Sequence, residues 1–397
     1  MAKKQAQSMR SDLLDRGVAE VVVRASLEKK LASGKKLKIK HGVDPTTADL
    51  HLGHAVIYEK LRQFQEAGHT IQFLIGGFTA RFGDPTDRAE RRALRSAAEV
   101  HRLAKKYVTQ LGKILDIKKV EVRSNAEWYD KMSAEDFLHL LSQVSVQRML
   151  ERDMFQQRMK EGKEIGLHEI TYPLLQGYDS VMLKADVTVI GRDQTFNELQ
   201  ARPLQEAAKQ SPQDLVIMPL LVGTDGKRKM SQSYGNAILL SDTPKDMYGK
   251  LMRIPDEQIV TFFTLLSRLP LSEIEEMAQG LKSGHNPRDV KAKLAHTLVA
   301  QYHSLNDADK AATEFQNVFQ KGATPDEVPE FSLKQKSTLL EILVSAKLVP
   351  SKSEGRRMLE QGAVRIDGKV EKDGAKELDA KKAPLLQVGK RRFVQIK

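Results

Sequence analysis

The stretch that decides the fold is Lys36-Leu-Lys-Ile-Lys-His-Gly42, in which apolar and polar residues alternate. This alternation predicts a β-strand that ends at the glycine. Residues 50–67 then carry apolar side chains at helical spacing and stop before Gly68, and residues 71–75 predict a second strand. The order strand–helix–strand predicts a βαβ unit with a parallel sheet, in which ligands bind beyond the carboxyl ends of the strands.

The rest of the chain divides by pattern. Further strands are predicted near residues 119–122, 187–190 and 215–218, after which the pattern is helical with breaks at three prolines. Residues 321–329 are rich in turn-forming residues and predict a linker. We therefore expect an α/β protein with three parts: a parallel-sheet domain at 1–240, an α-helical domain and linker at 241–330, and a small α+β domain at 331–397.

Composition narrows the class of protein. The 397 residues include no cysteine, which excludes disulfides and thiolate metal sites, and the ten histidines are too scattered to suggest a metal centre. No apolar run approaches the roughly 18 residues that a membrane span needs, and the N-terminus lacks the apolar stretch of a signal peptide. We expect a soluble cytoplasmic protein without a metal site.

Positive charge is concentrated near the C-terminus. Residues 332–397 hold 16 Lys or Arg and 8 Asp or Glu, a net of +8 out of +12 for the whole chain. Such an excess on a small appendage is typical of RNA binding, although a generic basic surface would give the same count.

The same C-terminal segment has a helix–hairpin pattern. Ser351-Lys-Ser-Glu354 predicts a capping box, in which the hydroxyl and the carboxylate each satisfy a free backbone N–H at a helix start. The helix ends at Gly362, a strand follows at residues 363–366, and Asp367-Gly368 predicts a tight hairpin turn.

This pattern resembles the alpha-L RNA-binding fold, found in a small-subunit ribosomal protein and in many RNA-modifying enzymes. The resemblance implies that Arg356 and Arg357, exposed in the first turns of the helix beside the hairpin, bind RNA. A plain surface helix and hairpin would give the same pattern, and of the two we favour RNA binding.

A first candidate site follows the first predicted strand, in Asp44-Pro-Thr-Thr-Ala-Asp-Leu-His-Leu-Gly-His54. Its two histidines fall on one side of the first helical turn, where the helix N-terminus favours anions and imidazole donors can bind a phosphate. Gly53 leaves room for a planar group to approach the backbone. The motif resembles the HIGH signature of class I aminoacyl-tRNA synthetases, which implies that His51 and His54 contact the reacting phosphate.

A second candidate site is the basic loop Gly223-Thr-Asp-Gly-Lys-Arg-Lys-Met-Ser-Gln-Ser-Tyr-Gly-Asn236. It resembles the KMSKS loop of the same class, which closes over the ATP triphosphate, and this resemblance assigns Lys229 to catalysis. The chain departs from the signature at Gln232, where the family has a lysine. An amide can donate a hydrogen bond to pyrophosphate oxygens but cannot neutralise their charge. Lys227 and Arg228 could supply the missing charge.

A third motif concerns the amino acid. In Tyr172-Pro-Leu-Leu-Gln-Gly-Tyr-Asp179, the residues Tyr172, Gln176 and Asp179 share one face of a helix. A phenol, an amide and a carboxylate suit the wall of a polar pocket better than a core. The motif resembles the tyrosine-binding helix of tyrosyl-tRNA synthetases. By that resemblance Asp179 accepts the phenol O–H of the substrate, and Tyr172 and Gln176 hold its α-ammonium group.

The resemblance covers nearly the whole chain. It is closest to the bacterial branch whose helical anticodon-binding domain leads directly into a single alpha-L module, and it implies a Rossmann-like catalytic domain at 1–240. It assigns further residues to tyrosine (Thr79, Asp84 and Gln194), to ATP (Gly42, Asp44, Gly53, Gly191, Asp193, Ser231 and Ser233, with His51, His54 and Lys229) and to catalysis at the phosphates (Thr46, Gln232 and Arg92, with Arg88 nearby). Arg92 could equally lie on a solvated helix face.

The implied reaction has two steps. The tyrosine carboxylate attacks the α-phosphate of Mg·ATP to give tyrosyl-adenylate and pyrophosphate, and the terminal ribose hydroxyl of tRNA(Tyr) then attacks the adenylate. Positioning and charge neutralisation suffice for the first step. No tightly bound cofactor is implied, and the family forms homodimers through an insertion expected at residues 125–185.

Three further positions depart from the family. Lys40 stands where many bacterial members have a second tyrosine facing the substrate hydroxyl. It could be a buried ammonium near Asp179 or point to solvent, and we favour solvent. Ile190 replaces the first glycine of a Gly-Gly-x-Asp-Gln motif, which narrows the space near the nucleotide, and Gly77 stands where the branch usually has aspartate.

Two other functions fit the sequence. One is a non-catalytic RNA-binding paralogue, for which Gln232 and Ile190 are the best evidence. The other is a synthetase of the same class for tryptophan, although those enzymes usually lack an alpha-L tail and Asp179 suits a phenol better. Failure to activate any amino acid would support the paralogue, and activation of tryptophan would support the second enzyme.

Overall fold

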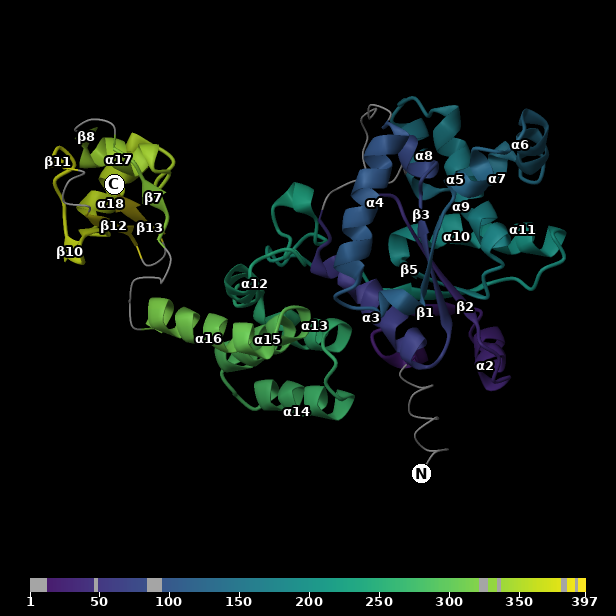
Figure 1. The fold of residues 1–397 in the computed structure, drawn as a ribbon, viewed down its shortest axis with the longest axis horizontal. Coiled ribbons are helices and arrows are strands. Elements are labelled where there is room, and N and C mark those ends of the chain that lie inside the picture. The colour runs from purple at the N-terminus through teal and green to yellow at the C-terminus, as the bar shows by residue number, and fades with distance from the viewer. Residues whose placement is uncertain are drawn as a thin grey trace. The chain divides into compact units, whose positions relative to one another are not determined.

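The predicted strand–helix–strand unit is present as β2 (Lys38–Val43), α3 (Leu52–Glu66) and β3 (Thr70–Ile75) (Figure 1). In this computed structural model the two strands pair in parallel along their full length. The structure describes residues 13–45, 49–83, 95–320, 328–333, 337–379, 384–389 and 392–397.

The chain forms two compact units, which are described one at a time. The first unit comprises Met1–Thr243 and Lys250–His303, and the second comprises Pro244–Gly249 and Ser304–Lys397. The three-domain division at residues 240 and 330 stays a prediction, and the predicted linker lies mostly outside the described residues.

A six-stranded sheet forms the centre of the first unit, in the order β1-β6-β5-β2-β3-β4. The strands β4 (Val120–Ser124), β5 (Val187–Gly191) and β6 (Asp214–Met218) lie where the sequence predicts strands, and all are parallel to their neighbours in β2 to β6. An edge strand, β1 (Glu20–Val22), pairs antiparallel with β6, and its three residues are too short for a sequence pattern to show. From β2 the chain adds β3 and β4 on one side of the sheet and then β5 and β6 on the other. The carboxyl ends of β2 and β5 therefore meet at a topological switch point.

Helices make up most of the rest of the first unit. Pro255 directly precedes a helical turn at Asp256–Gln258, Pro270 directly precedes α14, and Pro287 begins α15. A missing backbone N–H costs little at such positions, so the three predicted proline breaks are confirmed. No helix in the described part of the chain has the length and hydrophobicity to cross a membrane. The helices are α2 (Arg24–Ala32), α4 (Ala97–Leu111), α5 (Ala126–Tyr129), α6 (Ala134–Leu141), α7 (Val146–Leu150), α8 (Asp153–Lys160), α9 (Leu167–Leu183), α10 (Thr195–Leu199), α11 (Ala201–Ala207), α13 (Ile259–Leu266), α14 (Leu271–Lys282) and α15 (Pro287–Tyr302), with α12 (Pro244–Leu251) shared between the units.

The side chain of Lys40 does not point to solvent, so that prediction was wrong. Adjacent residues of a strand point to opposite faces of the sheet. Lys40 is fully buried against Ser180 of α9 and Glu198 of α10, whereas the His41 ring packs on Tyr58 of α3. Helices therefore cover both faces of the sheet, and a central parallel strand has no solvent side whatever its polar pattern.

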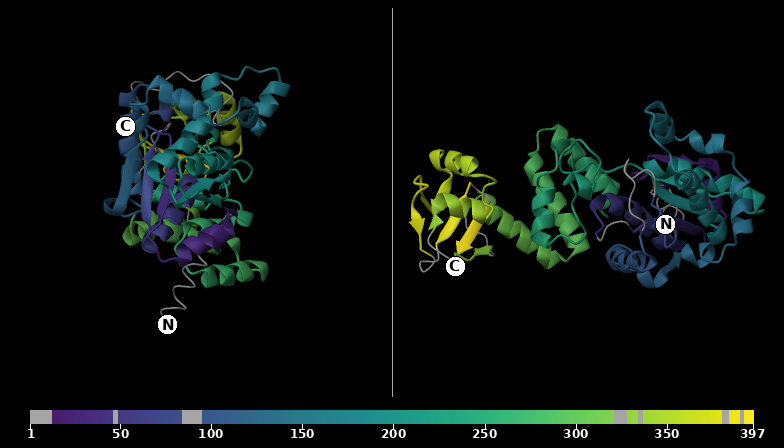
Figure 2. Two further views of the ribbon diagram at one scale, coloured as in Figure 1. Left: turned by 90° about the vertical axis from the view of Figure 1, so that its right-hand side faces the viewer. Right: turned by 90° about the horizontal axis from the view of Figure 1, so that it is seen from above.

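The second unit is built around a small apolar core. Its main sheet has the order β10-β9-β12-β13-β7, and a second sheet pairs β11 with β8. The right-hand view of Figure 2 shows these strands in yellow beside the helices of the unit. The elements are α16 (Leu305–Gln320), β7 (Glu330–Phe331), β8 (Ser337–Thr338), α17 (Leu339–Ser345), α18 (Lys352–Glu360), β9 (Val364–Ile366), β10 (Lys369–Val370), β11 (Glu377–Leu378), β12 (Leu385–Val388) and β13 (Arg392–Ile396).

The helix and hairpin predicted for the C-terminal segment are both present. At the start of α18 the Ser351 hydroxyl accepts a hydrogen bond from the Glu354 N–H at 3.2 Å. The Glu354 carboxylate pairs with Arg357 at 2.8 Å, which corrects the second half of the predicted capping box. Asp367 and Gly368 have φ angles of 48° and 79°, the left-handed values that a two-residue hairpin turn requires.

Candidate active site

A cleft opens where the carboxyl ends of β2 and β5 meet. Every residue predicted for tyrosine, ATP or catalysis that the structure describes lines this cleft. Thr46, Asp84 and Arg92, and also Arg88, lie outside the described residues. The predicted residues in the cleft are Gly42, Asp44, His51, Gly53, His54, Thr79, Tyr172, Gln176, Asp179, Gly191, Asp193, Gln194, Lys229, Ser231, Gln232 and Ser233.

One wall of the cleft is helix α9, which presents Tyr172, Gln176 and Asp179 to the cavity. The Tyr172 hydroxyl donates a hydrogen bond to Asp44 Oδ2 at 2.8 Å, and the Thr79 hydroxyl donates one to Asp44 Oδ1, also at 2.8 Å. Asp44, at the end of β2, therefore orients a residue of α9 and a residue that follows β3.

The carboxylate of Asp179 is buried and held by two donors. It accepts hydrogen bonds from Trp128 Nε1 at 3.1 Å and from Asn125 Nδ2 at 3.3 Å. Burial raises the pKa of Asp179 to about 7, against the opposing effects of the Lys40 charge and of these hydrogen bonds. Asp179 therefore titrates near neutral pH, and its ionised form has lone pairs left for a further O–H donor.

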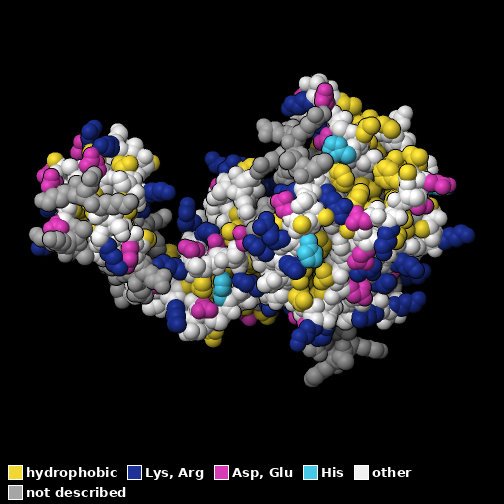
Figure 3. Space-filling view, turned by 45° about the horizontal axis from the view of Figure 1, so that its top comes forward, with side chains coloured by type: hydrophobic (Ala, Val, Ile, Leu, Met, Phe, Trp, Pro, Cys, Tyr) yellow, Lys and Arg dark blue, Asp and Glu magenta, His cyan; other side chains and the backbone are white. Residues whose placement is uncertain are grey.

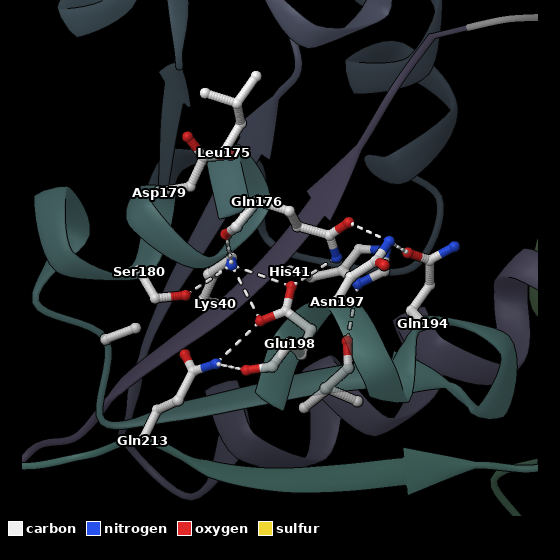
Figure 4. Close-up of polar contacts among 12 residues, drawn as sticks. Lys40, His41, Leu175, Gln176, Asp179, Ser180, Gln194, Asn197, Glu198 and Gln213 are labelled. Atoms are coloured by element: carbon white, nitrogen blue, oxygen red, sulfur yellow. Dashed lines mark hydrogen bonds and ion pairs between the residues drawn. The ribbon is translucent and has the colours of Figure 1, made fainter. Parts of the chain in front are cut away.

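Lys40 and Glu198 form a buried ion pair next to Gln176 (Figure 4). The Lys40 ammonium lies 2.9 and 3.0 Å from the two carboxylate oxygens of Glu198 and 2.7 Å from the Ser180 hydroxyl. Glu198 also accepts hydrogen bonds from Gln176 Nε2 at 2.8 Å and Gln213 Nε2 at 2.9 Å. Burial alone would raise the pKa of Glu198, but the Lys40 charge and these donors hold it below its usual value.

The Gln176 amide is fixed from both ends. Its Nε2 donates to Glu198, and its Oε1 accepts a hydrogen bond from Asn197 Nδ2 at 2.9 Å. Asn197 Nδ2 also donates to Gln194 Oε1 at 3.0 Å. Two predicted pocket residues, Gln176 and Gln194, are thus linked through α10.

The two predicted histidines lie at the start of α3. His54 Nδ1 accepts a hydrogen bond from the His51 N–H at 3.2 Å, which leaves the ring proton of His54 on Nε2. The two ring centroids are 3.9 Å apart. A Cβ at position 53 would lie 2.9 Å from the His51 ring, so Gly53 makes room for that imidazole, whereas the sequence suggested room for a bound planar group.

Both imidazoles are neutral at pH 7. Burial, together with the nearby Lys229 charge, lowers the pKa of His51 to about 4. Burial also lowers the pKa of His54 well below its usual value. A neutral imidazole offers one N–H donor and no charge. The pair can therefore donate hydrogen bonds to phosphate oxygens, while charge neutralisation has to come from a cation such as Lys229.

The basic loop is folded by its last residue. Asn236 Oδ1 accepts a hydrogen bond from the Ser231 N–H at 2.8 Å, and its Nδ2 donates to the Lys229 carbonyl at 3.2 Å. A Cβ at position 223 would lie 2.3 Å from the Asn236 side chain, so Gly223 permits this arrangement. Asn236 therefore fixes the segment that carries Lys229 and Ser231 beside the cleft.

Lys229 and Gln232 have different partners. The Lys229 ammonium lies 3.6 Å from Oδ2 of Asp193, a residue predicted to bind ATP. Gln232 Nε2 donates a hydrogen bond to the Asp49 carbonyl at 2.6 Å. Asp49 precedes His51 by two residues, so the Gln232 amide connects the loop to the start of α3. The family signature has a charged lysine at the position of Gln232.

Packing explains the local effect of two departures from the family sequence. Ile190 lines the cleft and packs with Leu215 and Ile217, so its side chain is part of the apolar core at the sheet. A Cβ at position 77 would lie 2.2 Å from the Ser124 hydroxyl. A side chain in place of Gly77 would therefore require Ser124 to move.

Three residues that build the cleft carry no sequence motif: Asn125, Trp128 and Glu198. Asn125 joins two predicted residues, because it donates to both Thr79 at 3.0 Å and Asp179 at 3.3 Å. Only for Glu198 did the sequence hold a signal. A lysine on a buried strand needs an anionic partner, but the sequence does not say which carboxylate that is.

Comparison with known proteins shows the family. A model of the family described as "tRNA synthetases class I (W and Y)" matches residues 32–320, and one described as "Tyrosine--tRNA ligase SYY-like C-terminal domain" matches residues 319–395. The tyrosine–tRNA ligase of Mannheimia succiniciproducens is 48% identical over 383 residues, which cover 96% of this chain and 97% of that protein. The chain belongs to the tyrosine–tRNA ligase family.

A further relative supports the same family, and a solved structure supports the fold. The tyrosine–tRNA ligase of Moorella thermoacetica is 45% identical over 390 residues, which cover 97% of this chain and 94% of that protein. A C-terminally truncated mitochondrial tyrosyl-tRNA synthetase of Aspergillus nidulans has a TM-score of 0.66 at 24% identity, and the match covers 80% of this chain and 99% of that one. The last likeness concerns the fold alone. The predicted membership of the tyrosine–tRNA ligase family and the predicted α/β fold class are confirmed.

Proposed function

We propose that this member of the tyrosine–tRNA ligase family activates L-tyrosine with ATP and transfers it to the 3′ end of tRNA(Tyr). The observation that carries the proposal is the Asp179 carboxylate, which is buried on the cleft wall and held by Trp128 and Asn125. A buried acceptor gains free energy from a donor and loses it when left unpaired. The phenol O–H of tyrosine supplies that donor, and phenylalanine does not.

The spacing along α9 supports this orientation of the substrate. Tyr172 and Asp179 are seven positions apart on the helix, which corresponds to a rise of about 10.5 Å. A tyrosine that lies along α9 with its phenol at Asp179 therefore extends its amino group toward Gln176 and Tyr172. Their side-chain oxygens are the acceptors that an α-ammonium needs.

The activation step needs positioning and charge neutralisation at the phosphates. A tyrosine carboxylate oxygen forms a bond to the α-phosphorus, and the bond from that phosphorus to the pyrophosphate oxygen breaks. His51 and His54 donate hydrogen bonds to phosphate oxygens, and Lys229 supplies positive charge as negative charge moves to the leaving pyrophosphate. ATP enters as its Mg²⁺ complex, so the metal is part of the substrate.

The second unit carries a basic surface that suits tRNA. Arg356 and Arg357 are exposed on α18, where their charges suit the phosphates of tRNA.

The helices inserted between β4 and β5 carry exposed apolar residues, among them Leu138, Val146 and Leu167. Figure 3 shows hydrophobic side chains gathered on one side of the first unit. We assign the inserted helices to a homodimer interface, because large exposed apolar patches mark association surfaces, and we place the enzyme in the cytoplasm.

Charging of tRNA tests the proposed function. The full chain, incubated with total bacterial tRNA, ATP and labelled tyrosine, should transfer label to tRNA, and periodate-oxidised tRNA, which lacks the terminal ribose diol, should accept none. Labelled tryptophan and phenylalanine should give no charging. Charging with tryptophan in place of tyrosine would refute the proposed substrate.

We expect the double variant R356E/R357E to lower kcat/KM for tRNA about tenfold or more at low salt, because it replaces two cations near RNA phosphates with anions. Tyrosine-dependent pyrophosphate exchange, which needs no tRNA, should change less than about twofold. The control K118E/K119E makes the same charge change on exposed residues of the first unit. Equal losses in the two double variants would show that total charge matters and that α18 does not bind tRNA.

We expect Gln232→Lys to raise the rate of tyrosine activation by about tenfold, because an ammonium neutralises the pyrophosphate charge and an amide does not. Gln232→Ala, which removes the hydrogen bond to the Asp49 carbonyl, should lower the rate. Single-turnover formation of tyrosyl-adenylate measures both. If the lysine variant is as slow as the alanine variant, the contact with Asp49 and not the missing charge limits the rate.

A further inference from the structure

The activation step as described makes no use of the buried ion pair between Lys40 and Glu198. Burying two charges costs free energy of desolvation, which attraction and hydrogen bonds only partly offset. Here both side chains are essentially inaccessible to water, at 0% and 1% exposure. The fold retains this pair beside a substrate cleft, where an apolar pair of the same volume would pack at lower cost. A role in the cleft would account for its presence.

The pair contacts the part of α9 that faces the amino acid. Lys40 Nζ donates to the Gln176 carbonyl at 3.2 Å and to the Ser180 hydroxyl at 2.7 Å, and Glu198 accepts the Gln176 side-chain amide at 2.8 Å. Asp179 belongs to the same helical turn. Figure 4 shows Lys40 between Gln176, Ser180 and Glu198, with Asp179 on the adjoining part of the helix.

We propose that the Lys40–Glu198 ion pair is a positioning element of the tyrosine site. It fixes the Gln176 amide, and its two opposite charges set how strongly Asp179 accepts the phenol O–H. This inference rests on the proposed function, because it takes the phenol of tyrosine as the group that Asp179 binds. In this role Lys40 and Glu198 are positioning residues.

The groups around Asp179 determine how strongly the ion pair affects the ionisation of this carboxyl group. Among the residues that the structure describes, Lys40, from β2, is the cation that acts on Asp179, and it favours the ionised carboxylate. From α5, the uncharged Tyr129 faces Asp179 and also favours its ionised form, and its hydroxyl donates to the Leu175 carbonyl at 2.6 Å. The other groups are the uncharged donors Asn125 and Trp128.

Two further titratable residues lie nearby. Tyr178 is the neighbour of Asp179 on α9 and is packed against Tyr129, and Asp44 lies in the same cleft, bonded to Tyr172. Neither brings a cation. Glu198 contacts Lys40 directly and so partly cancels the charge that Asp179 experiences.

The two members of the pair should therefore have opposite effects on pH dependence. The ionised carboxylate is the stronger acceptor of the phenol O–H, so kcat/KM for tyrosine should fall as the pH drops through the pKa of Asp179, about 7. This fall of kcat/KM at low pH is the acid limb of the pH profile. Lys40→Met removes the favourable charge and should shift the midpoint of the acid limb to a pH about one unit higher. Glu198→Gln leaves the ammonium unopposed and should move the limb down.

The experiment measures tyrosine-dependent pyrophosphate exchange between pH 6 and 9 for the wild type, both single variants and the double variant K40M/E198Q. The limb of the double variant should fall between those of the singles. KM for ATP should change less than about twofold, because the pair contacts the amino-acid wall. Lys30→Met is the control, since Lys30 pairs at 2.9 Å with a buried carboxylate, Asp214, that does not line the cleft.

The outcomes separate this inference from the proposed function. Opposite shifts of the acid limb in the two single variants, with no shift in Lys30→Met, support it. Shifts in the same direction, no shift, or losses independent of pH and equal to those of Lys30→Met overturn it. If Lys40→Met does not fold, Glu198→Gln alone decides by the presence or absence of a downward shift. A wild type without tyrosine exchange at any pH would refute the proposed function itself.

Discussion

Replacement of Asp179 by asparagine should lower kcat/KM for tyrosine activation by about 100-fold, with most of the loss in KM for tyrosine. A hydrogen bond to a charged group contributes about 1.5–3 kcal/mol, and the variant replaces this acceptor with a neutral amide. The amide also has one oxygen for two donors, because Trp128 and Asn125 bond to different oxygens of the carboxylate. The asparagine NH₂ group must then face one of these donors.

The control is Asp214→Asn, which changes another fully buried carboxylate, at the start of β6 and so at the opposite end of a parallel strand from the cleft. It should lower thermal stability without raising KM for tyrosine. A wild-type KM for tyrosine in Asp179→Asn would show that this carboxylate does not bind the phenol. The proposed orientation of the substrate along α9 would then be wrong.

Replacement of Lys229 by alanine should lower kcat for tyrosyl-adenylate formation by about 100-fold or more while KM for tyrosine stays within about twofold. Removing one preorganised group that stabilises transition-state charge costs about 2.7–4 kcal/mol. The neutral His51 and His54 cannot replace the charge, since burial lowers both of their pKa values. Rapid-quench measurement of the first turnover isolates this step.

The control is Arg228→Ala, the neighbouring cation on the same loop. The Arg228 guanidinium pairs with Asp225 at 3.0 Å and lies 4.6 Å from the centre of the Tyr234 ring. This variant should retain kcat within about threefold. Equal losses of kcat in the two variants would mean that the loop acts through its summed charge and that Lys229 makes no specific contact with the phosphates.

Local sequence patterns could predict the parts of the site that single segments build. The histidines of α3, the basic loop and the polar face of α9 each follow from spacing within one segment, and β2, α3 and β3 follow from periodicity. All of these line one cleft because parallel strands bring their carboxyl ends to one edge of the sheet.

Contacts between distant segments could not be predicted. Lys40 meets Glu198 across 158 positions of sequence, and Gln232 reaches Asp49 across 183. The alternating pattern around Lys40 indicated a solvent-facing side chain, because period-two alternation cannot distinguish a polar face exposed to water from one buried against helices. Asn125 and Trp128 follow β4 with no motif of their own, and their role depends on where α9 packs.

The central claim is that this chain activates tyrosine, and amino-acid-dependent exchange of labelled pyrophosphate into ATP tests it most directly. The assay uses the full chain without tRNA and adds tyrosine, tryptophan and phenylalanine separately. Exchange with tyrosine alone is the predicted result. Exchange with tryptophan or phenylalanine instead would contradict the assignment of Asp179 to the phenol, and folded protein without any exchange would contradict the proposed catalysis and leave RNA binding as the function.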